Sequence, residues 1–294
     1  MALAGGHPGA MTASETAPGA LLPATLRLGA VHLTVADIER SVAFYRDALG
    51  LQVARRDERG AALGAGGEEL VVLHAEPGAR PAGRHAGLFH YALLYESRDE
   101  LARAVQRLAA TQTRISGASD HGVSEAIYLS DPDGNGIELY ADRPREAWPP
   151  PDDGDRVGMY TRPLDVHGLL GTVMDTALPR HAGAGLRMGH VHLHVGDLEA
   201  ARPFYVGVLG FEQMTTYPGA LFLAAGGYHH HLGLNTWRGE GVGPAPAGTV
   251  GLREWTVVLD ADSLGALRGR LAAAGLGDGD LVADPWGIRV RFVA

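Results

Sequence analysis

The sequence contains no cysteine, and this absence excludes disulfides, iron–sulfur clusters, thiolate zinc sites and cysteine nucleophiles. Lysine is absent as well, so the 25 basic residues are all arginines, and 34 acidic residues leave a net charge of −9. This acidic balance argues against nucleic acid as a partner, because nucleic-acid binding favours a basic face. Any bound metal would have to be held by nitrogen and oxygen atoms.

Long apolar runs are also missing. No run approaches the roughly 20 residues that a membrane helix needs, and the N-terminus lacks the basic start and apolar core of a signal peptide. We therefore expect no membrane partner and a cytoplasmic location. The 42 glycines form no phosphate-binding fingerprint between a strand and a helix, which argues against nucleotide binding.

What the 294-residue chain does contain is an internal repeat. Residues 28–51 read LGAVHLTVADIERSVAFYRDALGL, and residues 188–211 read MGHVHLHVGDLEAARPFYVGVLGF. Each copy has an alternating strand, an aspartate that can cap a helix, a Phe-Tyr pair and a terminal Leu-Gly. One difference matters most, because Ala30 of the first copy is replaced in the second by His190, a potential metal ligand.

A second type of unit follows each copy of the repeat. Residues 87–94 (GLFHYALL) and 251–258 (GLREWTVV) are predicted strands, and each precedes a helix, a DPDG or DPWG turn and a last strand. The chain is therefore predicted to be an α+β protein of four βαβββ-like modules. We predict a disordered tail over residues 1–26 and two domains of two modules each, over residues 27–142 and 186–294. Between the domains we predict a proline-rich linker, residues 143–185, with a short helix near residues 164–175.

These motifs resemble those of the vicinal oxygen chelate superfamily, which includes glyoxalase I, fosfomycin and bleomycin resistance proteins, and extradiol ring-cleaving dioxygenases. The resemblance rests on the repeated segment and on DPDGNGIELY at residues 131–140. It covers about residues 27–142 and 186–294. The four modules and the motif GGYHHHLGLNTW at residues 226–237 resemble the catechol 2,3-dioxygenase branch. The resemblance implies a fold of two vicinal-oxygen-chelate barrels or half-barrels.

The resemblance also implies a metal site, because members of the superfamily carry ligands on the first and last strands of a module. In this sequence the matching positions hold His90, Glu138 and His190. Two histidines and one carboxylate form the set that binds non-haem Fe(II) and leaves positions open, and Mn(II) accepts the same set. The remaining matching positions hold residues that do not complete a site, namely Ala30, Glu254 and Arg289. Modules two and three are therefore predicted to pack into the active barrel, and modules one and four into an inactive one.

Other residues match positions that act on substrate in extradiol enzymes. Aligning GGEELVVL with GGYHHHLG places Leu70 opposite His230, and the resemblance implies that His230 is the acid–base residue beside the O2 site. Imidazole suits that role because it can take and give a proton near neutral pH. His121 and Tyr128 stand upstream of the DPDGNG turn, where the resemblance implies hydrogen bonds to the bound substrate.

The remaining histidines of interest are placed by strand alternation. Read as a strand, HHH puts His229 and His231 on one face and His230 on the other, which leaves the roles of the outer two open. His192 and His194 share a strand face with His190, so we expect them to line the same cavity. There they would contact substrate or orient the metal ligands.

Together these features predict an Fe(II)-dependent extradiol dioxygenase of aromatic catabolism, which converts a small aromatic diol and O2 into a muconic-semialdehyde type of acid. One alternative is a glyoxalase-like lyase or isomerase using Zn, Ni or Mn, although such sites usually carry two carboxylates. Another is a metal-free drug-binding resistance protein, which would leave the three ligands without a purpose. The sequence leaves the oligomeric state open and is compatible with a homo-oligomer.

Overall fold

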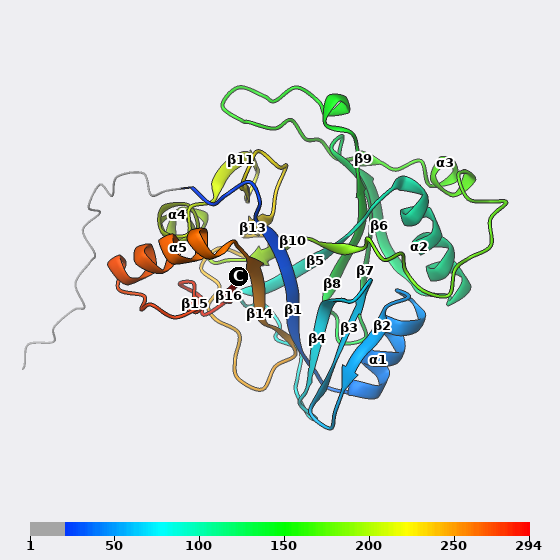
Figure 1. Cartoon of the computed structure of the whole chain (residues 1–294), viewed down its shortest axis with the longest axis horizontal. Helices are drawn as coiled ribbons and strands as arrows, with labels where there is room; N and C mark the ends of the chain where they lie inside the picture. The colour runs from blue at the N-terminus through cyan, green and yellow to red at the C-terminus, as the bar shows by residue number, and fades with distance from the viewer. Residues whose placement is uncertain (1–20) are drawn as a thin grey trace, which may run out of the picture.

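The computed structural model describes residues 21–294, whose strands form two curled sheets (Figure 1). The first sheet has the order β15-β16-β14-β1-β4-β3-β2, and the second has the order β11-β12-β13-β10-β5-β8-β7-β6-β9. The strands of the first sheet are β1 (Arg27–Val35), β2 (Gln52–Arg56), β3 (Gly60–Ala65), β4 (Glu68–Ala75), β14 (Gly251–Val258), β15 (Leu281–Ala283) and β16 (Arg289–Val293). Those of the second are β5 (Gly87–Tyr95), β6 (Ile115–Asp120), β7 (Ser124–Ser130), β8 (Gly136–Asp142), β9 (Arg162–Pro163), β10 (Arg187–His194), β11 (Glu212–Tyr217), β12 (Ala220–Ala224) and β13 (Leu232–Asn235).

Each sheet combines one module from each half of the sequence. The first sheet is joined where β1 pairs antiparallel with β14, and the second where β10 pairs antiparallel with β5. Modules two and three therefore share one sheet, as the positions of the ligands predicted, and modules one and four share the other. Each sheet contains strands from both halves of the sequence, so neither sheet corresponds to one half. We therefore propose residues 27–142 and 186–294 as units of the sequence duplication.

The helices begin at the capping residues that the repeat predicted. Asp37 accepts the backbone N–H of Arg40 at 3.0 Å, and Asp197 caps the equivalent helix of the second copy. The copies then diverge because Pro203 has no N–H to donate, and there the second helix continues as a π-helical segment. The helical elements are α1 (Ile38–Asp47), α2 (Arg98–Ala110), α3 (Val166–Gly171), α4 (Leu198–Arg202), the π-helical segment (Pro203–Val208), α5 (Ala261–Ala273) and a 3-10 turn (Arg145–Ala147). No helix within residues 21–294 is both long and apolar enough to span a membrane.

The predicted disordered tail extends too far toward the first strand. Residues 1–20 of that tail lie outside the described residues, but two of residues 21–26 pack onto the protein. Leu22 and Leu26 are buried in the main hydrophobic core, and the N–H of Leu22 donates to the carbonyl of Gly210 at 2.9 Å. The tail prediction is therefore corrected at its C-terminal end, where two leucines supply enough apolar surface to order the chain.

Two buried tyrosines connect the repeated helices to the DPxG turns of the following modules. The hydroxyl of Tyr45 donates to Asp131, and the hydroxyl of Tyr205 donates to Asp284, each at 2.9 Å. Burial raises the pKa of both tyrosines well above the ordinary value, so each remains a hydrogen-bond donor at neutral pH. These contacts explain the tyrosine of each Phe-Tyr pair and the turn aspartate of each half as parts of one structural link between the sheets.

Candidate metal centre

The three predicted metal ligands lie together on neighbouring strands of the second sheet. His90 is on β5, Glu138 on β8 and His190 on β10, and β5 lies between the other two strands (Figure 1). Nε2 of His90 and Nε2 of His190 each lie 3.0 Å from Oε2 of Glu138. One potential ligand atom of each side chain lies within 4.8 Å of the others. All three side chains are buried, with exposed fractions of 6%, 3% and 1% in chain order.

The donor set fits a divalent cation. Two ligand atoms about 2.1 Å from an ion and at a right angle to each other are roughly 3 Å apart, which matches the distance from each histidine to Glu138. Burial would raise the pKa of the Glu138 carboxyl, but the charge and hydrogen bonds of His190 and His90 hold that pKa well below its usual range. Burial lowers the pKa of His190, against the opposing effect of Glu138. The site thus offers an ionised carboxylate and a neutral imidazole, the protonation states that metal binding requires.

A cavity of about 300 Å³ adjoins this cluster. His90 and Glu138 are part of its wall, and so are His121, Tyr128 and His230. The remaining lining residues are Phe89, Ser119, Val123, Ser124, Met159, Tyr160, Thr161, His192, Tyr217, Phe222 and Trp237. A cavity of this size is at the small end of those that bind small molecules, and it is large enough for a single substituted ring.

His121 and Tyr128, both predicted to contact substrate, form a hydrogen-bonded pair on this wall. Nε2 of His121 lies 2.7 Å from the hydroxyl of Tyr128, and Nδ1 lies 3.0 Å from the carbonyl oxygen of Tyr160. Since a carbonyl only accepts, Nδ1 of a neutral His121 carries the proton, and Nε2 accepts from Tyr128. Tyr128 lies directly opposite Glu138 in the β7–β8 ladder, and burial together with that carboxylate raises the pKa of Tyr128 well above its ordinary value.

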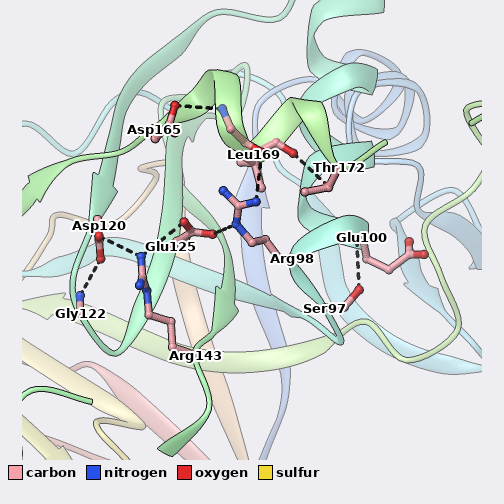
Figure 2. A network of polar contacts seen from close by, with 11 residues as sticks. Ser97, Arg98, Glu100, Asp120, Gly122, Glu125, Arg143, Asp165, Leu169 and Thr172 are labelled. Carbon is pink, nitrogen blue, oxygen red and sulfur yellow. Dashed lines mark hydrogen bonds and ion pairs between the residues drawn. The ribbon is translucent and has the colours of Figure 1, made fainter. Parts of the chain in front are cut away.

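An ion-pair network outside the cavity supports the β6–β7 hairpin that carries this pair. Figure 2 shows Arg98 and Arg143 pointing toward Glu125 from opposite sides. Arg98 comes from α2 and also donates to the carbonyl of Gly168 in α3 at 3.1 Å, while Arg143 follows β8 and donates to Asp120 at 2.9 Å. The network therefore connects β6, β7 and β8 with the predicted linker helix, which is shorter than predicted.

The three consecutive histidines do not form a strand, contrary to the sequence interpretation. They lie in the turn between β12 and β13, and β13 begins only after His231. Alternation therefore does not separate them by face: His229 and His230 are in direct contact, with 2.8 Å between their Nδ1 atoms. His231 serves the turn itself, since its Nδ1 accepts the N–H of Ala225 at 3.2 Å.

His229 connects His230 to an acidic residue that the sequence analysis missed. Nε2 of His229 lies 2.8 Å from Oδ1 of Asp142, the last residue of β8. A carboxylate only accepts, so with both imidazoles neutral His229 donates through Nε2 and accepts through Nδ1. His230 then donates through its own Nδ1, which leaves its Nε2 as an acceptor. The ring of His230 lies 4.1 Å from the ring of His190, and burial lowers its pKa well below the ordinary value.

His192 and His194, predicted to line one cavity, occupy different places. His192 is part of the cavity wall and lies so close to the backbone of Gly233 that a Cβ there would be 2.7 Å from the ring. His194 is two residues further along β10 and is not in the wall; its Nδ1 lies 2.6 Å from Oδ1 of Asn235. The ring of Phe89 packs against both imidazoles, at centroid distances of 5.1 Å and 4.9 Å, and contributes to the wall in place of His194. The prediction that His194 lines the cavity is therefore wrong.

Several cavity residues gave little or no signal in the sequence. Met159, Tyr160 and Thr161 belong to the predicted linker, where no periodicity marks a binding residue. Trp237 could have been found, because it ends the GGYHHHLGLNTW motif that the resemblance singled out. Asp142 is the last residue of the strand that carries Glu138. Only its contact with His229 in the structure indicates a role in the site.

The first sheet contains the equivalent of this cluster without its ligands. His32 pairs with Glu254 as His192 pairs with His90, so Glu254 occupies the place of His90. Thr256 pairs with Arg291 as Ala92 pairs with Glu138, which puts Arg291 rather than Arg289 in the place of Glu138. The prediction of Arg289 is corrected: the correct alignment counts from the turn aspartate, and Arg289 instead donates to the carbonyl of Arg253 at 2.9 Å.

In this equivalent place the carboxylate already has a cation. Arg291 donates to both oxygens of Glu254, at 2.6 Å and 3.2 Å. Burial would raise the pKa of the Glu254 carboxyl, but the pair with Arg291 holds it below its ordinary value.

The alignment of Leu70 with His230 is also corrected. Val31 pairs with Val71, whereas the matching Val191 pairs with Leu232, so the second copy has one extra residue before its strand. By strand register Leu70 therefore matches His231. The extra residue lengthens the turn in which His230 reaches the cavity.

Comparison with known proteins finds a matching family model and a similar curated protein. The family model described as the glyoxalase/bleomycin resistance protein/dioxygenase superfamily matches residues 27–139 and 187–292. A curated protein of Bacillus subtilis (strain 168), named catechol-2,3-dioxygenase, is 46% identical over 240 residues, which cover 79% of this chain and 82% of the relative.

Solved structures share the fold at low sequence identity. A putative dioxygenase from Bacillus subtilis superposes with a TM-score of 0.59 at 13% identity, covering 90% of this chain and 84% of its own. Glyoxalase I from Zea mays superposes with a TM-score of 0.55 at 19% identity, covering 92% of each chain. At such identities the likeness concerns the arrangement of the modules, and fold alone does not decide the reaction.

Proposed function

The chain belongs to the glyoxalase/bleomycin resistance protein/dioxygenase superfamily, and we propose that within it the protein is an Fe(II)-dependent extradiol dioxygenase. The reaction would insert both atoms of O2 into a catechol-type ring beside the diol, giving a muconic-semialdehyde type of acid. The observation that carries the proposal is the single-carboxylate cluster of His90, Glu138 and His190 beside a ring-sized cavity, in a chain related to a catechol-2,3-dioxygenase. A cytoplasmic location and a role in aromatic catabolism stay predictions.

The three clustered side chains would hold the ion. Bound Fe(II) would acidify the diol and couple it electronically to O2, while Mn(II) fits the same donor set. The chain's own residues would orient the substrate: the hydroxyl of Tyr128, held by Nε2 of His121, faces the cavity as a polar group next to Glu138. A buried phenol with a raised pKa keeps its proton, and by turning that single proton from Nε2 of His121 to the substrate it would donate to an oxygen anion there.

His230 would manage the proton of the reaction. Its neutral imidazole lies in the cavity wall beside His190, and the hydrogen bonds through His229 to Asp142 leave Nε2 as the acceptor. An imidazole in that state can take a proton from the diol and later return it. Asp142 and His229 would be positioning residues, since they fix the tautomer of His230 without lining the cavity themselves.

The test is anaerobic purification, loading with Fe(II), and addition of catechol and O2. We expect uptake of one O2 per catechol and a yellow ring-fission product. Loading with Mn(II) in a parallel sample distinguishes the two cations. Failure to bind any metal after anaerobic purification would favour the drug-binding alternative. Metal binding without O2 uptake, together with isomerisation of a glutathione hemithioacetal, would favour the glyoxalase-like alternative.

A further inference from the structure

The cavity beside the metal cluster has one polar wall and one apolar wall. The polar wall contains His121, Tyr128 and the serines and threonine near them. The apolar wall contains four aromatic residues and a methionine, and the imidazole of His192, whose pKa burial lowers, lies among their rings; the five residues are Phe89, Met159, Tyr217, Phe222 and Trp237. No arginine is among the lining residues, and the sequence has no lysine, so the cavity has no permanent cation on either wall.

Trp237 stands at the outer end of the apolar wall. Its side chain is part of the cavity wall although 51% of the residue is exposed, which places it at the mouth. The ring lies 5.4 Å from the ring of Phe89 and 5.4 Å from that of His192, measured between centroids. Nε1 donates to the carbonyl of Pro218 at 3.1 Å, so the edge of the indole that carries its N–H faces away from a bound ring.

Two residues behind the wall fix the position of Trp237. Oδ1 of Asn235 accepts from the backbone N–H of Trp237 at 3.1 Å and from Nδ1 of His194 at 2.6 Å. Two donors on one oxygen settle the orientation of the amide. Asn235 is completely buried, and burial with the charge of Arg238 lowers the pKa of His194 to about 4, so the imidazole is neutral at pH 7. His194 thus acts on the cavity through Asn235 although it does not line it.

We propose that this cavity selects uncharged catechols with an apolar ring substituent, that Trp237 is the specificity-determining residue, and that His194 and Asn235 are positioning residues for it. The inference rests on the proposed ring-cleavage function and names its substrate class. An ionised carboxylate on the ring would lose its hydration in the cavity without meeting a cation, which is costly. A methyl group would instead contact the aromatic wall, where one such group discriminates by roughly 10-fold.

The experiment compares kcat/KM of the Fe(II)-loaded enzyme for catechol, 4-methylcatechol and 3,4-dihydroxybenzoate. We expect 4-methylcatechol to be favoured over 3,4-dihydroxybenzoate by at least about 100-fold, because the loss of carboxylate hydration and the gain of apolar contact add. Turnover of both within about 10-fold would overturn the proposal.

Variants then test the residues. Trp237→Ala should lower the preference for 4-methylcatechol over catechol by roughly 10-fold, and Trp237→Phe should restore most of it. His194→Leu, which cannot donate to Asn235, should lower the same preference by a smaller factor, whereas His194→Gln should retain it. Met174→Ala serves as the control, because Met174 is 75% exposed and does not line the cavity. An unchanged preference in Trp237→Ala would contradict the role of Trp237, provided that its melting temperature matches that of the wild type.

Equilibrium binding separates this inference from the proposed function. Calorimetric titration of the three compounds into metal-loaded protein without O2 measures the selectivity of the cavity whether or not the ring is cleaved. Selective binding of 4-methylcatechol without O2 uptake would contradict the proposed reaction and retain the cavity assignment. Ring cleavage with equal binding of all three compounds would support the proposed reaction and contradict the cavity assignment.

Discussion

The two sheets place different chemistry at equivalent positions of one scaffold. In the second sheet the buried carboxylate Glu138 faces two imidazoles, those of His90 and His190, and no arginine within residues 21–294 pairs with it. In the first sheet the buried carboxylate Glu254 is neutralised by the bidentate pair with Arg291, and Ala30 stands where His190 would be. The difference teaches that the two places diverge in both ligands and charge. The second sheet keeps three potential ligands and no arginine for its carboxylate, whereas the first sheet lacks the histidines and pairs its carboxylate with an arginine.

The strongest way to break this comparison is to remove the charge from each carboxylate in turn. Glu138→Gln should abolish metal retention and lower ring cleavage at least about 1,000-fold, because the ion supplies several kcal/mol of stabilisation. The matched variant Glu254→Gln should retain the wild-type metal content and activity. Metal content by elemental analysis and O2 uptake are the measurements. Equal losses in both variants would show that the first sheet also contributes to metal binding.

A second test uses the turn aspartates that link the sheets. Burial raises the pKa of Asp284 to about 6, above the roughly 3.9 expected in the unfolded chain. As the pH rises from 4 to 6 the unfolded chain ionises while the folded protein stays largely protonated, so stability should fall by roughly 2 kcal/mol. Asp284→Asn should remove this decrease, as measured by urea unfolding at pH 4.5 and 6.5.

The helix cap Asp260 provides the control of opposite sign. Hydrogen bonds from Ser263 lower the pKa of Asp260, so its contribution is present above the unfolded pKa and is lost as the pH falls through the folded value. Asp260→Asn should therefore leave the decrease between pH 4 and 6 in place. The same pH dependence of stability in the wild type and in Asp284→Asn would contradict the role of Asp284.

A third test sharpens the comparison at the neighbouring strand position. Tyr128 lies opposite Glu138 in the second sheet, and Leu281 lies opposite Arg291 in the first. Tyr128→Phe removes the hydroxyl that His121 holds, so kcat for ring cleavage should fall by about 10- to 100-fold with metal content unchanged. If the hydroxyl serves only to stabilise the strand, the melting temperature will fall and kcat at a permissive temperature will not.

The smallest expected effect concerns the ion pair of the first sheet. Arg291→Met leaves Glu254 buried without its cation and should lower the free energy of unfolding by about 1–2 kcal/mol, a modest value because the arginine is partly exposed. Adding Glu254→Leu to that variant should recover most of the loss. A double-mutant cycle in urea measures both. An additive outcome would mean that the pair contributes nothing beyond its separate side chains.

The sequence predicted those parts of the molecule where a local pattern and a long-range constraint coincide. The strands and capped helices of the repeat have period-two and period-3.6 patterns bounded by Asp37 or Asp197, and their positions agree with the structure. The pairing of modules two and three followed from the ligands alone, since His90, Glu138 and His190 have to meet at one ion. Strand β6, with the sequence ISGASD, was missed because small polar residues have low strand propensity.

The errors in the site arose where the two copies differ in loop length. Alignment of the two turns on Gly-Ile instead of the aspartate placed Arg289 where Arg291 lies. One extra residue before β13 moved the histidines out of a strand, so alternation misassigned His229 and His231. His194 was misplaced because a shared strand face does not reveal which neighbouring ring covers it. Loop insertions leave no periodicity, and only the register of paired strands corrects them.

Each sheet joins a module from the first half of the chain to one from the second half, and this determines which sheet can be completed first during synthesis. When β5 and β8 leave the ribosome with His90 and Glu138, the edge of β5 has no partner until β10 arrives with His190. β1 is synthesised first, and its edge stays unpaired for longer because its partner β14 is synthesised near the end of the chain. The sheet with the metal cluster can therefore close while the other is still open. A nascent chain stalled after β13 should already hold the complete ligand set, with the exposed edge of β1 as its point of vulnerability to aggregation.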